Sequence, residues 1–161
     1  MSHPQKYDHF VKPGHIVACT DPGFFASVVG SSVIVTLFNN KYYFGGMCHF
    51  VYPKPSDKHL SALYGNGSIL ELTRAMKNMG SWSKDLEAHI IGGANYDDSP
   101  DCPAKDNIAM AERMLHKFNI RVVSRDVGGK MGRKIMFDPS TGEVVVAKTT
   151  QLRDSDWYRY A

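Results

Sequence analysis

Three segments with the composition of β-strands follow one another early in the chain, with no helical pattern between them. They are rich in β-branched and aromatic residues, which favour strands over helices. Gly30 separates the first two and predicts a bulge or a close backbone approach. Asn39 and Asn40 predict a hairpin-type turn before the third. The three segments are 24–29, 33–38 and 41–52, and further strands are expected at 15–19, 86–91, 120–124, 133–137 and 143–148.

Helical periodicity begins only after these strands. Apolar residues recur at helical spacing from Ile69 to Met79, and Gly80 stands where a left-handed C-cap belongs. Asp106 is expected to N-cap a second helix, whose apolar face ends at Phe118. Strands first and helices later are typical of an α+β fold and not of a doubly wound α/β fold. We therefore expect two layers of mostly antiparallel or mixed sheet, with two main helices on one side.

The chain of 161 residues has the length of one domain. We expect a flexible N-terminal arm at 1–13, a single folded domain at 14–150 and a C-terminal tail at 151–161. A net charge of +3 is too small for a dedicated nucleic-acid binder. The longest apolar stretch is too short to cross a bilayer, so no membrane insertion is expected. The first residues lack a secretory signal pattern and the three cysteines are widely spaced, so we expect a reduced, cytoplasmic protein.

The common cofactor and metal motifs are missing from the sequence. Gly65 and Gly67 lack the third glycine of a dinucleotide-binding motif, and Gly129-Lys130 lacks the first glycine of a P-loop. The sequence contains no Cys-x-x-Cys and no His-Glu-x-x-His. We therefore expect neither a cofactor nor a metal ion.

Two short motifs on neighbouring strands carry the strongest chemical signal. A hairpin between them would bring Ser32 near His49, and a hydroxyl beside an imidazole is the arrangement of an activated nucleophile. From composition alone, the ordinary alternative is a small-residue bulge beside a half-buried histidine. The motifs are Gly30-Ser31-Ser32-Val33 and Gly45-Gly46-Met47-Cys48-His49.

In these motifs the chain resembles the chemoreceptor glutamine deamidase family, CheD. The family reads Leu-Gly-Ser-Cys-Val and then Gly-Gly-Met-x-His, at a spacing that this sequence keeps. The resemblance extends over roughly residues 14–148. It implies a layered α/β/β sandwich, similar to the catalytic domain of cytotoxic necrotizing factor toxins. Further segments that resemble the family follow in order, at Gly92-Gly93-Ala94, Asn107-Ile108, Asp126-x-Gly128-Gly129, Gly132-Arg133 and Thr141-Gly142.

The resemblance also implies an activity, the hydrolysis of chemoreceptor glutamine side chains to glutamate and ammonia. A cysteine thiolate attacks the amide in this family and a histidine moves the proton. Here Ser32 occupies the cysteine position and His49 the histidine position. The family's third catalytic group, a threonine, matches Ala26, so Ser27 or Ser31 would have to replace it.

Serine at the nucleophile position predicts impaired turnover, because a hydroxyl ionises far less readily than a thiol. Three explanations remain open: an engineered substitution, a natural loss of activity, and a serine enzyme with weak or altered activity. Cys48 is a poor substitute, because neighbouring strand residues point to opposite faces and Cys48 would face away from His49. The sequence does not fix the position of Cys19.

These observations predict a CheD-like chemotaxis protein with Ser32, His49 and Ser27 as its catalytic group. The expected partner is the cytoplasmic domain of a chemoreceptor, together with the phosphatase CheC. The alternative is an inactive binding module that docks chemoreceptors or CheC, and a small-molecule hydrolase of the same broad fold is a third class. The residues expected to let the backbone approach a substrate are Gly30, Ser31, Gly45 and Gly46.

Overall fold

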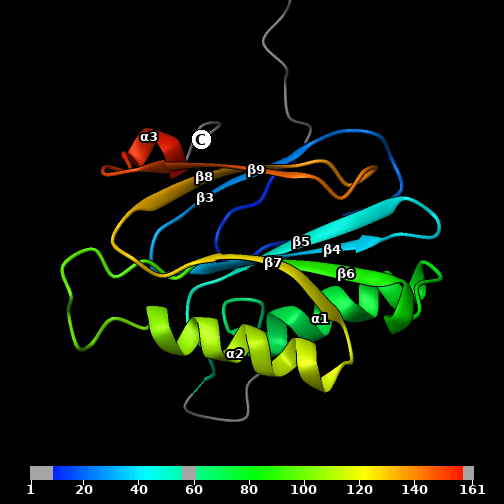
Figure 1. Ribbon diagram of the computed structural model, residues 1–161, viewed down its shortest axis with the longest axis horizontal. Helices are drawn as coiled ribbons and strands as arrows, with labels where there is room; N and C mark the ends of the chain where they lie inside the picture. The colour runs from blue at the N-terminus through cyan, green and yellow to red at the C-terminus, as the bar shows by residue number, and fades with distance from the viewer. Residues whose placement is uncertain (1–8, 56–60, 158–161) are drawn as a thin grey trace, which may run out of the picture.

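Two stacked β-sheets form the body of the molecule (Figure 1). The computed structural model describes residues 9–55 and 61–157. A four-stranded sheet has the order β1-β3-β8-β9, and a five-stranded sheet has the order β2-β5-β4-β6-β7. The strands are β1 (His9–Phe10), β2 (Ile16–Cys19), β3 (Phe25–Val29), β4 (Val33–Asn39), β5 (Phe44–Phe50), β6 (Leu86–Gly92), β7 (Arg121–Val127), β8 (Gly132–Phe137) and β9 (Val144–Thr149).

The two long helices, α1 (Gly65–Asn78) and α2 (Ala104–Lys117), cover the outer face of the five-stranded sheet. The short 3-10 helix η1 (Ser83–Asp85) leads into β6, and α3 (Asp154–Trp157) lies against the four-stranded sheet on the opposite side of the molecule. The layers therefore run from helices to five-stranded sheet to four-stranded sheet, which confirms the expected α+β sandwich. Within the described ranges, no helix is both long and apolar enough to span a membrane.

The sheets are mixed, as expected. Strand pairs β1–β3 and β6–β7 are parallel, and the remaining pairs are antiparallel. Strand alternation divides β5 between two cores. Met47 packs into the cluster between the two sheets, whereas Cys48 and Phe50 pack into the cluster under the helices.

Both ends of the described chain differ from expectation. His9 and Phe10 pair with β3, and Val11 is only 2% exposed, so residues 9–13 are not a loose arm, while residues 1–8 lie outside the described ranges. At the other end, the described part of the expected tail, residues 151–157, packs onto the domain, while residues 158–161 lie outside the described ranges. Leu152 lies against Gly132, and the buried Asp156 accepts a hydrogen bond from Lys134 Nζ at 3.0 Å.

Helix α2 also begins earlier than the sequence predicts. Pro103 occupies the N-cap position, and Asp106 lies in the first turn, so the expected Asp106 cap is wrong. An acidic side chain in a first turn still interacts favourably with the helix dipole. Asp106 thus correctly indicated the beginning of a helix, but the helix begins just after Pro103.

Candidate active site

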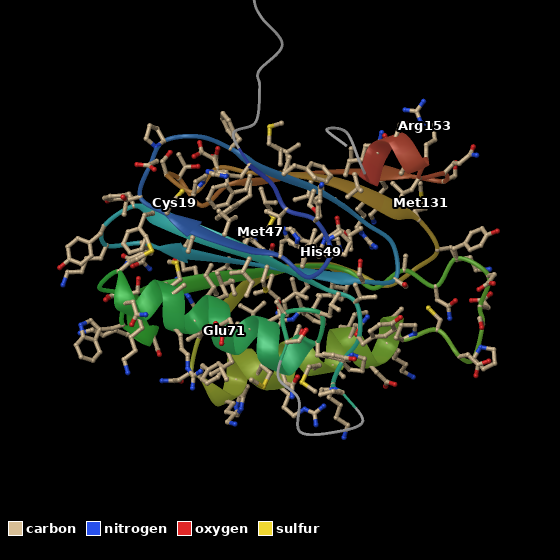
Figure 2. The ribbon with its side chains drawn as sticks, turned by 180° about the vertical axis from the view of Figure 1, so that it is seen from behind. Cys19, Met47, His49, Glu71, Met131 and Arg153 are labelled. Atoms are coloured by element: carbon tan, nitrogen blue, oxygen red, sulfur yellow. The ribbon has the colours of Figure 1, made fainter. Side chains whose placement is uncertain are left out.

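Two strands from opposite sheets and one loop bring one imidazole and two hydroxyls together. His49 lies on β5, Ser27 on β3 of the opposite sheet, and Ser32 in the loop between β3 and β4. Ser32 Oγ is 2.7 Å from His49 Nε2, and Ser27 Oγ is 3.1 Å from His49 Nδ1. His49 lies in the interior between the two sheets (Figure 2), and all three side chains are at most 4% exposed. The expected trio is therefore assembled in one place.

Strand register explains why Ser32 reaches His49. Ile34 of β4 is the antiparallel partner of His49, so the two side chains share a face of the sheet. Ser32 stands two positions before Ile34 and falls on the same face by strand alternation. That face points toward the four-stranded sheet, which supplies Ser27 from the other side.

The backbone carbonyl of Val11 fixes the direction of the hydrogen bonds. Ser27 Oγ donates to Val11 O at 2.6 Å, and His49 Nδ1 also lies 3.4 Å from that carbonyl. The hydroxyl of Ser27 has one proton, which it donates to the carbonyl of Val11. Ser27 Oγ must therefore accept a hydrogen bond from His49 Nδ1–H. This assignment leaves His49 Nε2 as a bare acceptor for the Ser32 hydroxyl. The imidazole is thus oriented as a general base toward Ser32.

Burial keeps the His49 ring neutral. Loss of solvation lowers the pKa of His49 to about 4, against a smaller opposing effect of the Val11 carbonyl, and His15 lowers it further. The neutral ring has the protonation state that a base requires at pH 7. A base with so low a pKa holds a proton weakly, however, which limits how far it can activate a hydroxyl.

A cavity of about 460 Å³ opens beside the nucleophile loop. Gly30 and Ser31 form part of its wall, whereas Ser32, the next residue along the chain, is buried and does not line the cavity. The C-terminal segment closes another side, because Leu152 packs over Gly132 and approaches Gly30. The remaining lining comes mainly from the loop before α2, with Ala94, Asn95, Tyr96, Asp97 and Cys102, and from Lys130, Thr150 and Gln151.

The glycines near the site have two different roles. A Cβ on Gly30 would make only an ordinary van der Waals contact, with Leu152 Cδ1 the nearest atom at 3.9 Å. A Cβ on Gly45 would lie 2.6 Å from Leu37 O, and one on Gly46 would lie 2.7 Å from both Val17 O and Leu72 Cδ1. Gly45 and Gly46 therefore permit close packing inside the protein, and the expectation that they admit a substrate is wrong.

Comparison with known proteins shows which family the chain resembles. The family model described as CheD chemotactic sensory transduction matches residues 52–148. Proteins named probable chemoreceptor glutamine deamidase CheD are also similar. One from Sulfurimonas denitrificans is 30% identical, covering 91% of this chain and 95% of its own length. Another from Trichlorobacter lovleyi is 32% identical over 89% of this chain and 91% of its own length.

The chain belongs to the CheD family. The family-model match begins after β5, so Ser32 and His49 lie outside it. The alignments with the relatives are longer, and a share of about nine tenths of this chain includes both residues. A relative from Thermococcus kodakarensis is 33% identical over 76% of this chain and 80% of its own length.

In this CheD-family protein, the hydroxyl beside His49 Nδ1 is that of Ser27 and not of a residue at the position of Ala26. Ala26 is the neighbour of Ser27 on β3 and so points to the opposite face of the sheet. Ser31 lines the cavity, outside the hydrogen-bonded trio. The choice that the sequence left open between Ser27 and Ser31 thus falls geometrically on Ser27.

Cys48 and Cys19 lie apart from the Ser32–His49 pair, whereas Cys102 lines the cavity beside Gly30 and Ser31. Cys48 is fully buried under the helices, and burial raises the pKa of its thiol to about 11, so it stays protonated. Cys19 pairs with Gly45, four positions from His49 along β5.

Within the described ranges, no group of three or more His, Cys, Asp or Glu side chains is arranged to hold a metal ion.

Sequence reasoning missed two contributors to the site. Val11 acts through its backbone carbonyl, and a carbonyl leaves no mark in a sequence. Asn107 reaches the nucleophile loop from α2, which is remote in the chain. Asn107 did belong to a segment that resembles the family, which was the one available signal.

Proposed function

We propose that this protein binds chemoreceptors at glutamine side chains and hydrolyses the amide slowly, with Ser32 as nucleophile and His49 as general base. The arrangement that supports the proposal is the buried series of contacts from Ser32 through His49 and Ser27 to Val11. The names of the relatives supply the substrate class, glutamine on chemoreceptors. Gly30 and Ser31, the two residues before Ser32, line the cavity, and the proposal places the incoming glutamine side chain there.

The chemistry proceeds through an ester on Ser32. Ser32 Oγ attacks the amide carbon while His49 Nε2 takes the hydroxyl proton. His49 then returns that proton to the leaving nitrogen, the C–N bond breaks, and ammonia departs. Water attacks the ester, with His49 again as base, and releases glutamate and the Ser32 hydroxyl. The net reaction consumes one water and yields one ammonia, and it needs no metal or redox partner.

Slow turnover follows from the chemistry of Ser32 and His49. A hydroxyl ionises far less readily than a thiol, so it requires a strong base. Burial lowers the pKa of His49 to about 4, which makes the ring a weak base. A thiol at the nucleophile position would need a weaker base, because a cysteine ionises with a pKa of about 8.5.

The same features favour a second candidate, a docking protein without turnover. A weakly basic, buried His49 beside a serine fits a site that retains glutamine without cleaving it. Its partner would be a chemoreceptor or the phosphatase CheC. This candidate keeps the cavity as the recognition surface and assigns no reaction to Ser32.

The test is ammonia release from a chemoreceptor cytoplasmic fragment, compared between the native chain and Ser32→Cys. We expect Ser32→Cys to release ammonia at least about tenfold faster, because the base that the thiol requires is already positioned. His49→Gln in the Ser32→Cys background is the matched control and should abolish the gain. Mass spectrometry of the fragment should show an increase of one dalton for each glutamine converted.

The outcomes separate the two candidates. Slow but Ser32-dependent release by the native chain supports the serine enzyme, and Ser32→Ala should then be silent. Release by the Ser32→Cys form alone supports a silenced enzyme that retains its site. If no form releases ammonia but the fragment is retained in a pull-down, the docking protein is the better account. If the fragment neither reacts nor binds, and CheC is not retained in the same pull-down either, both candidates are wrong.

A further inference from the structure

Asn107 joins the two strand ends that carry the nucleophile and the base. Its Nδ2 donates to Ser31 O at 3.1 Å and to Val51 O at 2.8 Å. Ser31 precedes Ser32, and Val51 follows β5, the strand of His49. The side chain of Asn107 is fully buried in the first turn of α2. One amide group therefore links the Ser32 loop, the His49 strand and the helical layer.

The two hydrogen bonds from Asn107 take the place of strand pairing just beyond the end of the β4–β5 ladder. The last paired residues of β4 and β5 at this end are Val33 and Phe50. Beyond them, the N–H of Val51 turns away and donates to Leu63 O at 2.8 Å. The carbonyls of Ser31 and Val51 thus lose their ladder partners, and Asn107 satisfies both. Without it, two partly buried carbonyls would lack protein partners at the end of the ladder.

The link also completes the anchoring of the nucleophile loop. The carbonyl of Gly30 accepts from Ala94 N–H at 2.9 Å, and that of Ser32 accepts from Gly93 N–H at 2.8 Å. Asn107 holds the carbonyl between them, that of Ser31. In a trans peptide the N–H points opposite to the preceding C=O, so fixing the Ser31 carbonyl also fixes the direction of the Ser32 N–H. No residue in the described ranges accepts a hydrogen bond from the Ser32 N–H.

The amide oxygen of Asn107, unlike its amide nitrogen, makes no hydrogen bond within the described ranges. This oxygen, Asn107 Oδ1, is also buried. Leaving a buried acceptor unsatisfied costs stability. An apolar residue of the same size would avoid that cost, so the position is poorly suited to stability alone and well suited to the two bonds that Nδ2 donates.

From this geometry we infer that Asn107 is a positioning residue for the reaction at Ser32. By clamping the carbonyls of Ser31 and Val51, it keeps Ser32 Oγ within hydrogen-bonding distance of His49 Nε2. It also holds the Ser32 N–H free to bind the negative oxygen that forms when the amide is attacked. The inference deepens the proposed function, since it takes Ser32 as the nucleophile.

The test uses the Ser32→Cys background, in which the introduced thiol reports on its surroundings without any receptor. Iodoacetamide labelling is followed by mass spectrometry across a pH series, with Cys19 and Cys102 as internal references. Asn107→Leu removes both donors and keeps the size of the side chain. Leu115→Ala, at an equally buried position on the same helix, is the control for general loosening.

The labelling midpoint is the pH at which half of the introduced thiol is ionised. We expect Asn107→Leu to shift this pH by about half a unit or more, toward the ordinary cysteine value of about 8.5. Leu115→Ala should leave the midpoint unchanged even though it lowers the melting temperature. With the receptor fragment, Asn107→Leu should lower kcat about tenfold and change KM less than about threefold, as expected when one transition-state interaction is lost.

An unchanged midpoint in folded Asn107→Leu, or an equal shift in Leu115→Ala, would overturn the inference. If Asn107→Leu does not fold, Asn107→Asp, which places an oxygen against the same two carbonyls, supports the same comparison. The proposed function is judged separately: if the parent Ser32→Cys releases no ammonia, that proposal fails, while the labelling comparison still decides the role of Asn107.

Discussion

The hydroxyl of Ser27 determines which nitrogen of His49 faces Ser32. Ser27 Oγ donates to Val11 O and so can only accept from His49 Nδ1. Losing this partner would allow the proton to move to Nε2, where it would point at Ser32 and block base catalysis. Ser27 is thus a positioning residue in the proposed mechanism, acting through the tautomer of the ring.

We predict that Ser27→Ala lowers kcat for ammonia release about tenfold in the Ser32→Cys background, the value of roughly one hydrogen bond. Steady-state kinetics with the receptor fragment measures this effect. Ser124→Ala is the matched control, because Ser124 bonds a different histidine, His89, at a distant position. Equal rates for Ser27→Ala and its parent would show that Ser27 does not orient the ring.

Acid should destabilise the protein through His49. Burial lowers the pKa of His49 to about 4 in the folded chain, below the unfolded value of about 6.5. Between these values the unfolded chain binds a proton that the folded chain does not, so stability is lost as pH falls from about 6.5 to about 4. We predict a contribution from His49 of roughly 2 kcal/mol to the loss of unfolding free energy between pH 7 and pH 5.

Urea unfolding at the two pH values, compared between the native chain and His49→Gln, isolates this contribution. The pH dependence should be weaker in His49→Gln by the stated amount. Met47→Leu perturbs the same inter-sheet layer without changing any titrating group, and it should keep the native pH dependence. An unaltered pH dependence in His49→Gln would mean that the ring is not held neutral by folding.

Side-chain chemistry at the site was predictable where strand periodicity carried it. The spacing of the two motifs placed Ser32 beside His49, and alternation placed Cys48 on the other face. Ser27 was one of two open choices, because selecting it requires knowing which face of β3 meets β5. Asn107 was out of reach, since its role depends on where α2 begins relative to the ends of β4 and β5.

At the scale of elements, α1 requires a glycine on β5. A Cβ on Gly46 would lie 2.7 Å from Leu72 Cδ1 on α1 and 2.7 Å from the backbone oxygen of Val17 on β2. The leucine could shift, but the backbone oxygen belongs to the paired neighbouring strand and cannot easily do so. The glycine thus sets how closely the helix and the strands approach each other.

We predict that Gly46→Ala lowers the unfolding free energy by roughly 1–3 kcal/mol, the usual cost of overpacking. Gly30→Ala is the matched control, since its Cβ would make only an ordinary van der Waals contact, and it should change stability by no more than about 0.5 kcal/mol. Urea unfolding at pH 7 measures both. Equal stability of the two variants would show that the layers can separate at no cost.

The glycine pair also shows a limit of reading elements from sequence. Consecutive glycines in a strand indicate close approach, but the sequence does not name the approaching group. We expected a substrate, whereas Gly45 is close to Leu37 O and Phe137 and Gly46 is close to α1 and β2. The places of these strands in the sequence were predictable from their β-type composition, but their lengths were not, since a strand expected at 41–52 is only Phe44–Phe50.

On the scale of the whole molecule, the site depends on contact between the two sheets. Ser27 comes from the four-stranded sheet and His49 from the five-stranded sheet. The layer order was predictable from the succession of strands and helices, because it follows from which faces must be buried. The packing of the terminal segments was not, since β1 is only two residues long and α3 only four.

Two separate hydrophobic clusters hold these layers together. One lies between the sheets and includes Phe137, and the other lies under the helices and includes Leu115. Both side chains are fully buried. Loosening the first cluster should disturb the distance between Ser27 and His49, whereas loosening the second should lower stability and leave that distance intact in folded molecules.

We therefore predict different effects of Phe137→Leu and Leu115→Ala in the Ser32→Cys background. Phe137→Leu should cost roughly 1–2 kcal/mol of stability, and Leu115→Ala about 2–5 kcal/mol. Ammonia release per folded molecule should nevertheless fall severalfold in Phe137→Leu and stay at the parental rate in Leu115→Ala. The rate of ammonia release should be measured at a temperature at which circular dichroism shows both variants to be fully folded. If activity instead followed stability, with Leu115→Ala the slower variant, the catalytic geometry would depend on the whole core and not on the contact between the sheets.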